Sequence, residues 1–138
     1  MFYNLYVDLE NYKILNNIGN GSYGSVYYVE NKHTHEKYAA KVFSNQIKNI
    51  FTDNIDIFHE YRSYIMVNHP SIVHFYGLSL NNLQNKPHPV ILLEYVPKGS
   101  LEKNIHKLTK TKRYIILLGV ALGMQYLHGK EIVHRDLK

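Results

Sequence analysis

The spacing of apolar positions changes along the chain from a strand-like to a helix-like pattern. Short runs rich in valine, isoleucine and aromatic residues are separated by glycine-rich or polar turns, as is typical of β-strands. These runs are residues 12–18, 26–29, 38–43, 72–80 and 90–96. The pattern predicts a sheet in the first two thirds of the chain, with helices inserted in it and following it.

Two shorter segments have helical spacing. Thr52 or Asp53 can cap a helix that runs to residue 67, before Pro70 stops it. Ser100 can cap a short helix that extends to residue 107.

The longest helix is expected over residues 110–128, where Gly129 would end it. Apolar side chains surround nearly all of its faces, and a helix of this kind needs burial on all sides. These side chains are Ile115, Ile116, Leu117, Leu118, Val120, Leu122, Met124 and Leu127. Residues 132–138 have the pattern of a strand that leads into a loop.

The composition is that of a globular and mildly basic chain. Its 138 residues are 45% apolar and 20% charged, which argues against wholesale disorder. Sixteen basic and eleven acidic residues give a formal charge of +5, which would suit nucleic acid, an acidic membrane surface or a phosphorylated ligand. The chain has no cysteine, which excludes disulfides and thiolate zinc sites and fits a reducing, cytoplasmic location.

Neither a nucleic-acid partner nor a membrane is expected. The basic stretch over residues 106–113 fits a solvated surface, and no nucleic-acid motif accompanies it. The most apolar stretch, residues 114–127, is too short to cross a bilayer. The histidines show no spacing typical of a metal site, so no metal ligands are expected.

A glycine-rich segment is the first candidate for chemistry. Residues 19–26 read Gly-Asn-Gly-Ser-Tyr-Gly-Ser-Val, and glycines let a backbone approach a phosphate closely. A Walker A loop would need lysine and then serine or threonine after the last glycine, and a dinucleotide fingerprint would need a helix there. Ser25 and the strand-like run after it fit neither. A hairpin folded over phosphates and a hairpin turn without a ligand both remain open.

Charged residues downstream could complete a phosphate site. Lys41 lies in an apolar strand, where a buried ammonium needs a partner, and Glu60 in the helix-like segment that follows this strand could pair with it. Residues 134–138 read His-Arg-Asp-Leu-Lys, in which Arg135 would keep Asp136 ionised. An ionised carboxylate suits a group that orients a hydroxyl and accepts its proton. A solvent-facing lysine, a solvated helix face and a charged tail are the alternatives.

The order of these motifs resembles the eukaryotic protein kinases, of the serine/threonine type and closest to the tyrosine-kinase-like group. Residues 69–73, 93–101 and 126–133 are also similar to segments of that family. The resemblance implies an α+β fold. An N-lobe with a five-stranded antiparallel sheet and helix C would span residues 12–93, a hinge 94–99, and the start of the C-lobe 100–138.

The resemblance also implies an ATP site with divided roles. The residues over the phosphates would be Gly19, Gly21, Ser22 and Gly24. Lys41, held by Glu60, would bind the α- and β-phosphates. The residues around adenine would be Val26, Ala39, the gatekeeper Leu93, and the backbones of Glu94 and Val96.

Catalysis by resemblance would rest on Asp136 as the base and on Lys138 near the γ-phosphate, where serine/threonine kinases carry lysine. Tyr38 and Ala40 differ from the commoner Val-Ala-Ile-Lys, but their side chains need not touch phosphate.

The family's magnesium ligands are expected beyond Lys138, because the 138 residues contain no Asp-Phe-Gly and no activation segment. A complete domain would use Mg²⁺ and a protein substrate. We expect this chain by itself to bind ATP weakly, to be inactive as a kinase, and to expose the apolar helix over residues 110–128. A noncatalytic nucleotide-binding or interaction module, or a truncated pseudokinase-like fragment, is the alternative.

Overall fold

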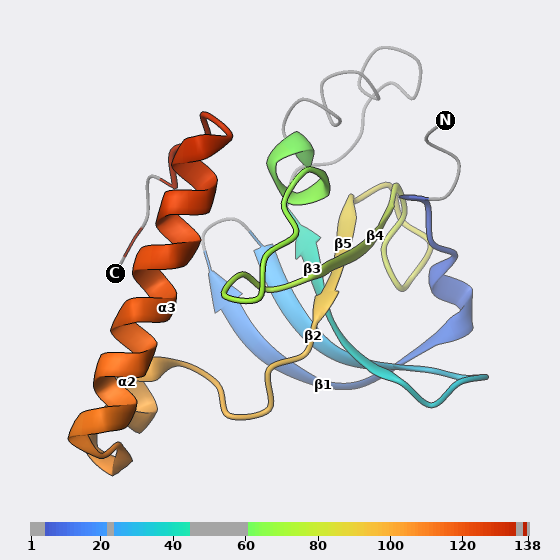
Figure 1. Cartoon of the computed structure of the whole chain (residues 1–138). Helices are drawn as coiled ribbons and strands as arrows, with labels where there is room; N and C mark the ends of the chain where they lie inside the picture. Colours follow the sequence, from blue (N-terminus) through green and yellow to red (C-terminus); the bar gives the residue numbers. More distant parts are fainter. Residues whose placement is uncertain (1–4, 22–23, 45–60, 135–136, 138) are drawn as a thin grey trace. The chain divides into compact units, whose positions relative to one another are not determined.

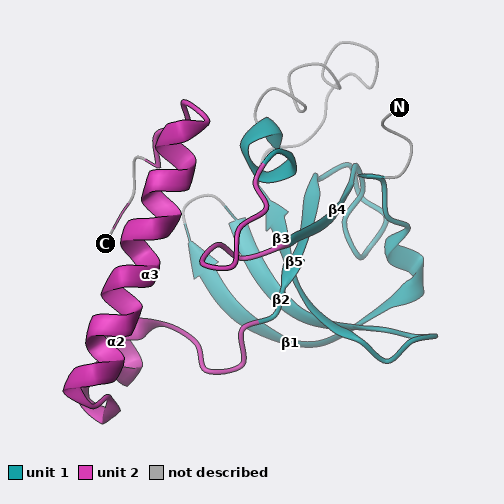
Figure 2. Ribbon diagram, in the orientation of Figure 1, with its two compact units in different colours: residues 1–66, 75–95 teal, residues 67–74, 96–138 magenta. Residues whose placement is uncertain are grey.

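The computed structural model describes residues 5–21, 24–44, 61–134 and 137. The chain divides into two compact units (Figure 2), one of residues 1–66 and 75–95 and the other of residues 67–74 and 96–138. The first unit carries the sheet, and the second carries the long helix. The domain limits at residues 93, 94–99 and 100 stay a prediction.

The sheet has five strands in the order β1-β2-β3-β5-β4, and every neighbouring pair is antiparallel (Figure 1). The strands are β1 (Tyr12–Gly21), β2 (Gly24–Asn31), β3 (Lys37–Phe43), β4 (Phe75–Ser79) and β5 (Val90–Glu94). The architecture confirms the expected five-stranded antiparallel sheet.

The strand ends differ from the apolar runs because pairing, and not hydrophobicity, decides them. β1 and β2 extend through the glycine-rich segment, where Gly21 pairs with Gly24. β4 begins at Phe75, where its ladder with β5 begins. β5 ends at Glu94, where its ladder with β3 ends. The predicted strands over residues 72–80 and 90–96 were therefore too long.

Alternation along the strands divides the apolar side chains between the two faces of the sheet. One face carries a cluster of buried residues that consists of Phe43, Tyr61, Leu78 and Ile91. The other face carries a second cluster, which consists of Leu9, Val29, Ala40, Val90 and Leu92. Burial on both faces makes the sheet a rigid platform for the residues at its edges.

The N-terminal segment covers the outer edge of β4. Tyr6 forms a parallel bridge with Leu78, and the backbone amide of Val7 donates to the Leu78 carbonyl over 2.9 Å. This close approach needs a glycine in β4, since a Cβ on Gly77 would collide with the Val7 side chain. A single-turn 3-10 helix, η2 (Leu9–Asn11), follows this segment. Covering the edge removes a row of unpaired backbone groups.

The helix expected over residues 53–67 is described in its last turn. Residues 61–65 are helical, and the Met66 amide donates to the Arg62 carbonyl over 3.0 Å. Thr52 and Asp53, the expected caps, lie outside the described residues. Tyr61 is 2% exposed and belongs to the core, so this turn is anchored on the sheet.

The second unit contains α2 (Leu101–Asn104), the 3-10 turn η3 (Ile105–Lys107) and α3 (Lys110–Gly129). Ser100 occupies the N-cap position of α2, but its side chain makes no capping bond. Instead, the Asn104 side chain donates to the Lys98 and Ser100 carbonyls over 2.6 and 2.9 Å. Ser100 is therefore at the predicted N-cap position, and the predicted capping hydrogen bond of its side chain is absent.

The C-terminus of α3 lies at Gly129, as predicted, but the left-handed residue that follows is Glu131, with φ 59°. The Glu131 amide donates to the His128 carbonyl and the Ile132 amide donates to the Leu127 carbonyl, a Schellman arrangement. The predicted strand over residues 132–138 was wrong for residues 132–134, which are not extended in a ladder. The Ile132 amide is bonded to the Leu127 carbonyl at the end of the helix and is therefore not available to a strand ladder.

α3 is buried along a narrow line and exposed elsewhere. Gly123 and Leu127 are its buried residues, and Gly123 packs near Ser71 and Ile72 of the same unit. The most exposed apolar side chains are those of Tyr114, Ile115, Leu117 and Leu118, which are 61%, 63%, 65% and 59% exposed. The exposed apolar surface expected on this helix is therefore present.

Candidate functional site

Residues predicted around the nucleotide come together on one face of the sheet. Gly19 is the cross-strand partner of Val26, and Val26 is the partner of Lys41. Ala39 is the partner of Leu93 in β5. Because directly opposed residues share a face, and residues two apart on a strand do too, Val26, Ala39, Lys41 and Leu93 face the same side.

The same register explains the departures from the family's usual strand. Tyr38 and Ala40 alternate with Ala39 and Lys41, so their side chains belong to the opposite face. Burial and a 2.8 Å hydrogen bond donated to Glu36 raise the pKa of Tyr38 to about 12. The hydroxyl of Tyr38 is therefore neutral at physiological pH and lies outside the candidate site.

Two asparagines, which the sequence reasoning did not single out, support the glycine-rich segment. The Asn17 side chain accepts a hydrogen bond from the Gly19 amide over 3.2 Å and donates one to Asn20 over 2.9 Å. The register of β1 shifts at Asn17, so the segment bends there. Asparagine beside glycine is the signal that could have indicated this brace. Ser22 lies outside the described residues.

Gly24 is required by the backbone of β3. Its φ of 141° is one that residues with a side chain rarely adopt, and a Cβ there would collide with the Val42 carbonyl oxygen. Gly21 has open space around its Cβ position, and a Cβ on Gly19 would make ordinary contact with Val26. The three glycines of the motif therefore meet different steric demands.

Lys41 is held by aromatic side chains of the first unit. Its Nζ donates to the Tyr64 hydroxyl over 3.5 Å and lies 5.0 Å from the centre of the Phe43 ring and 5.8 Å from that of Tyr64. An ammonium over a ring face is attracted by the ring quadrupole. The predicted partner, Glu60, lies outside the described residues. The sequence signal for Tyr64 was its helical apolar position, which did not indicate a hydroxyl aimed at Lys41.

The hinge residues are divided between the two units. Leu93 packs against the core cluster of Phe43 and Ile91, whereas Glu94, the last residue of β5, is exposed. Tyr95 stacks on Tyr28 of β2 with ring centres 4.0 Å apart. In the second unit Val96 is 46% exposed, and its carbonyl accepts from the Gly99 amide over 3.2 Å.

Asp136 and Lys138, the predicted catalytic residues, lie outside the described residues. Over the part of the chain that the structure describes, no three histidine, aspartate or glutamate side chains gather to hold a metal ion. The described residues therefore do not fit a resident Mg²⁺. Nor does any helix within these ranges have the length and apolarity needed to cross a membrane.

Comparison with known proteins agrees with this geometry. The protein kinase domain model matches residues 12–138. The chain is 31% identical over 142 aligned residues to tyrosine-protein kinase receptor svh-2 of Caenorhabditis elegans, and this alignment covers 96% of the chain and 12% of that protein. It is 33% identical over 128 residues to serine/threonine-protein kinase TAO3 of Rattus norvegicus, and this alignment covers 90% of the chain and 14% of that protein.

Proposed function

Because the chain belongs to the protein kinase family, we propose that it is the ATP-binding part of a serine/threonine kinase, which transfers the γ-phosphate of ATP to protein hydroxyls. The serine/threonine specificity rests on Lys138 and on the likeness to TAO3. The likeness to svh-2, a tyrosine kinase receptor by name, makes this specificity a point to test. The chain spans 12% and 14% of the length of these two relatives, so the activity of the whole protein is part of the proposal.

The observation that carries the proposal is the register that gives Val26, Ala39, Lys41 and Leu93 one face. In the proposed complex the adenine contacts Val26, Ala39 and Leu93, and its polar edge bonds the backbones of Glu94 and Val96. The Lys41 ammonium binds the α- and β-phosphates. An ion pair of this kind is stronger where water is partly excluded.

The remaining proposed roles belong to the glycine segment and to the end of the chain. Gly19, Gly21, Ser22 and Gly24 lie over the phosphates, where the glycines let the backbone approach closely because they carry no side chains. Asp136 accepts the proton of the attacking hydroxyl, and Lys138 lies near the γ-phosphate. No step is assigned to Mg²⁺, although the family generally uses it with ATP.

Nucleotide binding tests this assignment directly. In NMR titrations of the ¹⁵N-labelled 138-residue chain, we expect ATP to shift the amide signals of Gly19, Gly21 and Lys41. Adenosine should shift those of Leu93 and Val96 and leave the glycine signals in place, because it carries no phosphate. We expect weak affinities for both. Equal responses of the glycine amides to ATP and adenosine would contradict the phosphate role.

Phosphoryl transfer by the 138-residue chain is expected to be undetectable. Proton transfer by a base contributes only about 10²–10⁴-fold, whereas positioning and charge neutralisation carry most of this reaction. The measurement is transfer from radiolabelled ATP to a generic acceptor protein, with Asp136→Asn as the control for contaminating kinases. Transfer that the Asp136→Asn change abolishes would show that the chain is catalytically sufficient. ATP binding without transfer is the result expected for the 138-residue chain. Absence of transfer also from a domain completed beyond Lys138 would favour a noncatalytic nucleotide-binding module.

A further inference from the structure

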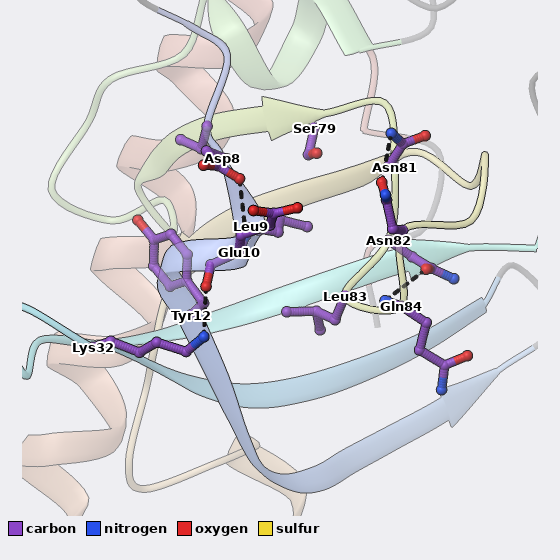
Figure 3. Close-up of a pocket in the computed structure, with 12 residues that line it drawn as sticks. Asp8, Leu9, Glu10, Tyr12, Lys32, Ser79, Asn81, Asn82, Leu83 and Gln84 are labelled. Atoms are coloured by element: carbon purple, nitrogen blue, oxygen red, sulfur yellow. Dashed lines mark hydrogen bonds between the residues drawn. The ribbon is translucent and has the colours of Figure 1, made fainter.

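A cavity of about 560 Å³ lies in the first unit (Figure 3). It lies on the side of the sheet away from Lys41, because Ser79 in its lining pairs with Val90, whereas Lys41 pairs with Ile91. Its walls are the N-terminal segment over residues 7–12 and the loop between β4 and β5, and Lys32 adds to one end. Its volume is within the range of pockets that hold small ligands or peptide side chains. The residues proposed for ATP do not line it.

Ser79 gives the first indication that the cavity holds a ligand. Its side chain lines the cavity and is 9% exposed, on the same face of the sheet as its partner Val90. The Ser79 hydroxyl makes no hydrogen bond with the described residues. Buried hydroxyls are nearly always paired, so a polar group brought into the cavity would satisfy it.

The charges at one end indicate the sign of the ligand. Asp8 and Glu10 are exposed there, and the Lys32 ammonium donates to the Glu10 backbone carbonyl over 2.6 Å (Figure 3). The Asp8 carboxylate accepts from the Glu10 amide and the Asn11 side chain, whereas the Glu10 carboxylate has no partner among the described residues. The lining thus carries two carboxylates and one ammonium, in a chain whose overall charge is +5. This excess of negative charge favours a cationic group.

Carboxamides at the other end suit a peptide backbone. The Asn82 side-chain oxygen accepts from the Gln84 and Lys86 amides over 2.9 and 3.0 Å, which fixes the loop. The Asn82 amino group and the whole Gln84 carboxamide make no bond within the described residues. A carboxamide can donate to and accept from a peptide group at the same time.

A smaller cavity of about 100 Å³ continues from the first and shares Asn82 and Gln84 with it. Ile14, Tyr27, Val42 and Leu83 give it an apolar wall opposite these two carboxamides. Ile14 is 45% exposed in the first strand, and an apolar side chain placed beside it would be removed from water.

We propose that these two cavities form a docking groove for an extended peptide segment of a partner protein. The segment presents a lysine or arginine to Asp8 and Glu10, bonds its backbone to Ser79, Asn82 and Gln84, and places an apolar side chain against Ile14. The groove acts independently of nucleotide, because it lies on the other face of the sheet from Lys41.

A selection from phage-displayed random heptapeptides on the full 138-residue chain tests the proposal. We expect the enriched peptides to share a basic residue and an apolar residue. Glu10→Gln should weaken their binding about tenfold, measured by fluorescence anisotropy, because a charge-assisted bond is lost. The matched control Glu102→Gln removes an equivalent exposed carboxylate of the second unit and should leave the affinity unchanged.

Ser79→Ala separates binding from folding. It removes a buried hydroxyl that has no partner among the described residues, so the melting temperature should not fall, while peptide affinity should fall several-fold. Failure to enrich any peptide, enrichment of peptides without a basic residue, or equal binding by wild type and Glu10→Gln would each overturn the proposal. An unchanged affinity of Ser79→Ala would do the same.

Discussion

Replacing Gly24 with alanine is expected to destabilise the first unit by about 3 kcal/mol or more, through the β2–β3 ladder. Gly24 is the first residue of β2, opposite Phe43, with a φ of 141°, and a Cβ on it would collide with the Val42 carbonyl oxygen. The obstacle is backbone within the sheet, so the clash cannot be relieved by a side-chain rotation. β2 and β3 must separate at this point, and the glycine-rich segment would lose the β2–β3 pairing that supports it.

Gly21→Ala is the matched control, because Gly21 belongs to the same motif and has nothing within 4 Å of its Cβ position. Urea unfolding followed by circular dichroism would measure both variants. We expect the midpoint to fall strongly for Gly24→Ala and little for Gly21→Ala. Similar decreases of the urea midpoint in the two variants would contradict the assignment of the destabilisation to the contact between Gly24 and β3.

Replacing Lys41 with alanine is expected to remove most phosphoryl transfer and to leave the fold largely intact. In a domain completed beyond Lys138, we expect kcat/KM to fall by about 10²–10³-fold, the usual result of removing one group that stabilises transition-state charge. Stability should change little, since the contacts of the ammonium with Phe43 and Tyr64 are of the cation–π kind, worth about 0.5–1 kcal/mol at partly exposed sites.

The control for Lys41→Ala is Lys37→Ala, which removes an exposed lysine from the same strand. Both variants would be assayed for transfer in the completed domain and for ATP and adenosine affinity in the 138-residue chain. Lys41→Ala should weaken ATP and spare adenosine, and Lys37→Ala should affect neither. Full activity of the Lys41→Ala domain would reject the assignment of this lysine to the phosphates.

Local sequence patterns predicted most of the described elements of this protein, although not their exact ends. The apolar runs around Lys41 and before Glu94 predicted strands at these places, because short runs of β-branched and aromatic residues between turns are typical of strands. The helix that ends at Gly129 followed from its length and apolar content in the same way. The family followed from the residues between positions 19 and 138, whose order and spacing are themselves properties of the sequence.

Predictions from local patterns failed where the hydrogen bond that forms depends on the tertiary structure. Ser100 occupies the expected N-cap position, yet its side chain makes no capping bond, and Asn104 fixes the turn through the Lys98 and Ser100 carbonyls. Residues 132–134 have strand-like side chains, but a strand also needs a partner ladder, and the Ile132 amide is engaged by Leu127. A hydrogen bond chosen between competing partners depends on geometry that a linear pattern does not contain.

The sequence by itself determined the sheet, the long helix, the kinase family and the residue types available for ATP. The tertiary structure decided which of them share a face, that Tyr64 and Phe43 hold the Lys41 ammonium, and that Gly77 makes room for Val7. It also decided that Ser79 is buried beside the carboxylates of residues 8 and 10, with no hydrogen-bond partner in the part of the chain that the structure describes. The physical reason is range: periodicity and capping act between residues a few positions apart, whereas these contacts join segments distant along the chain, where packing alone selects the partner.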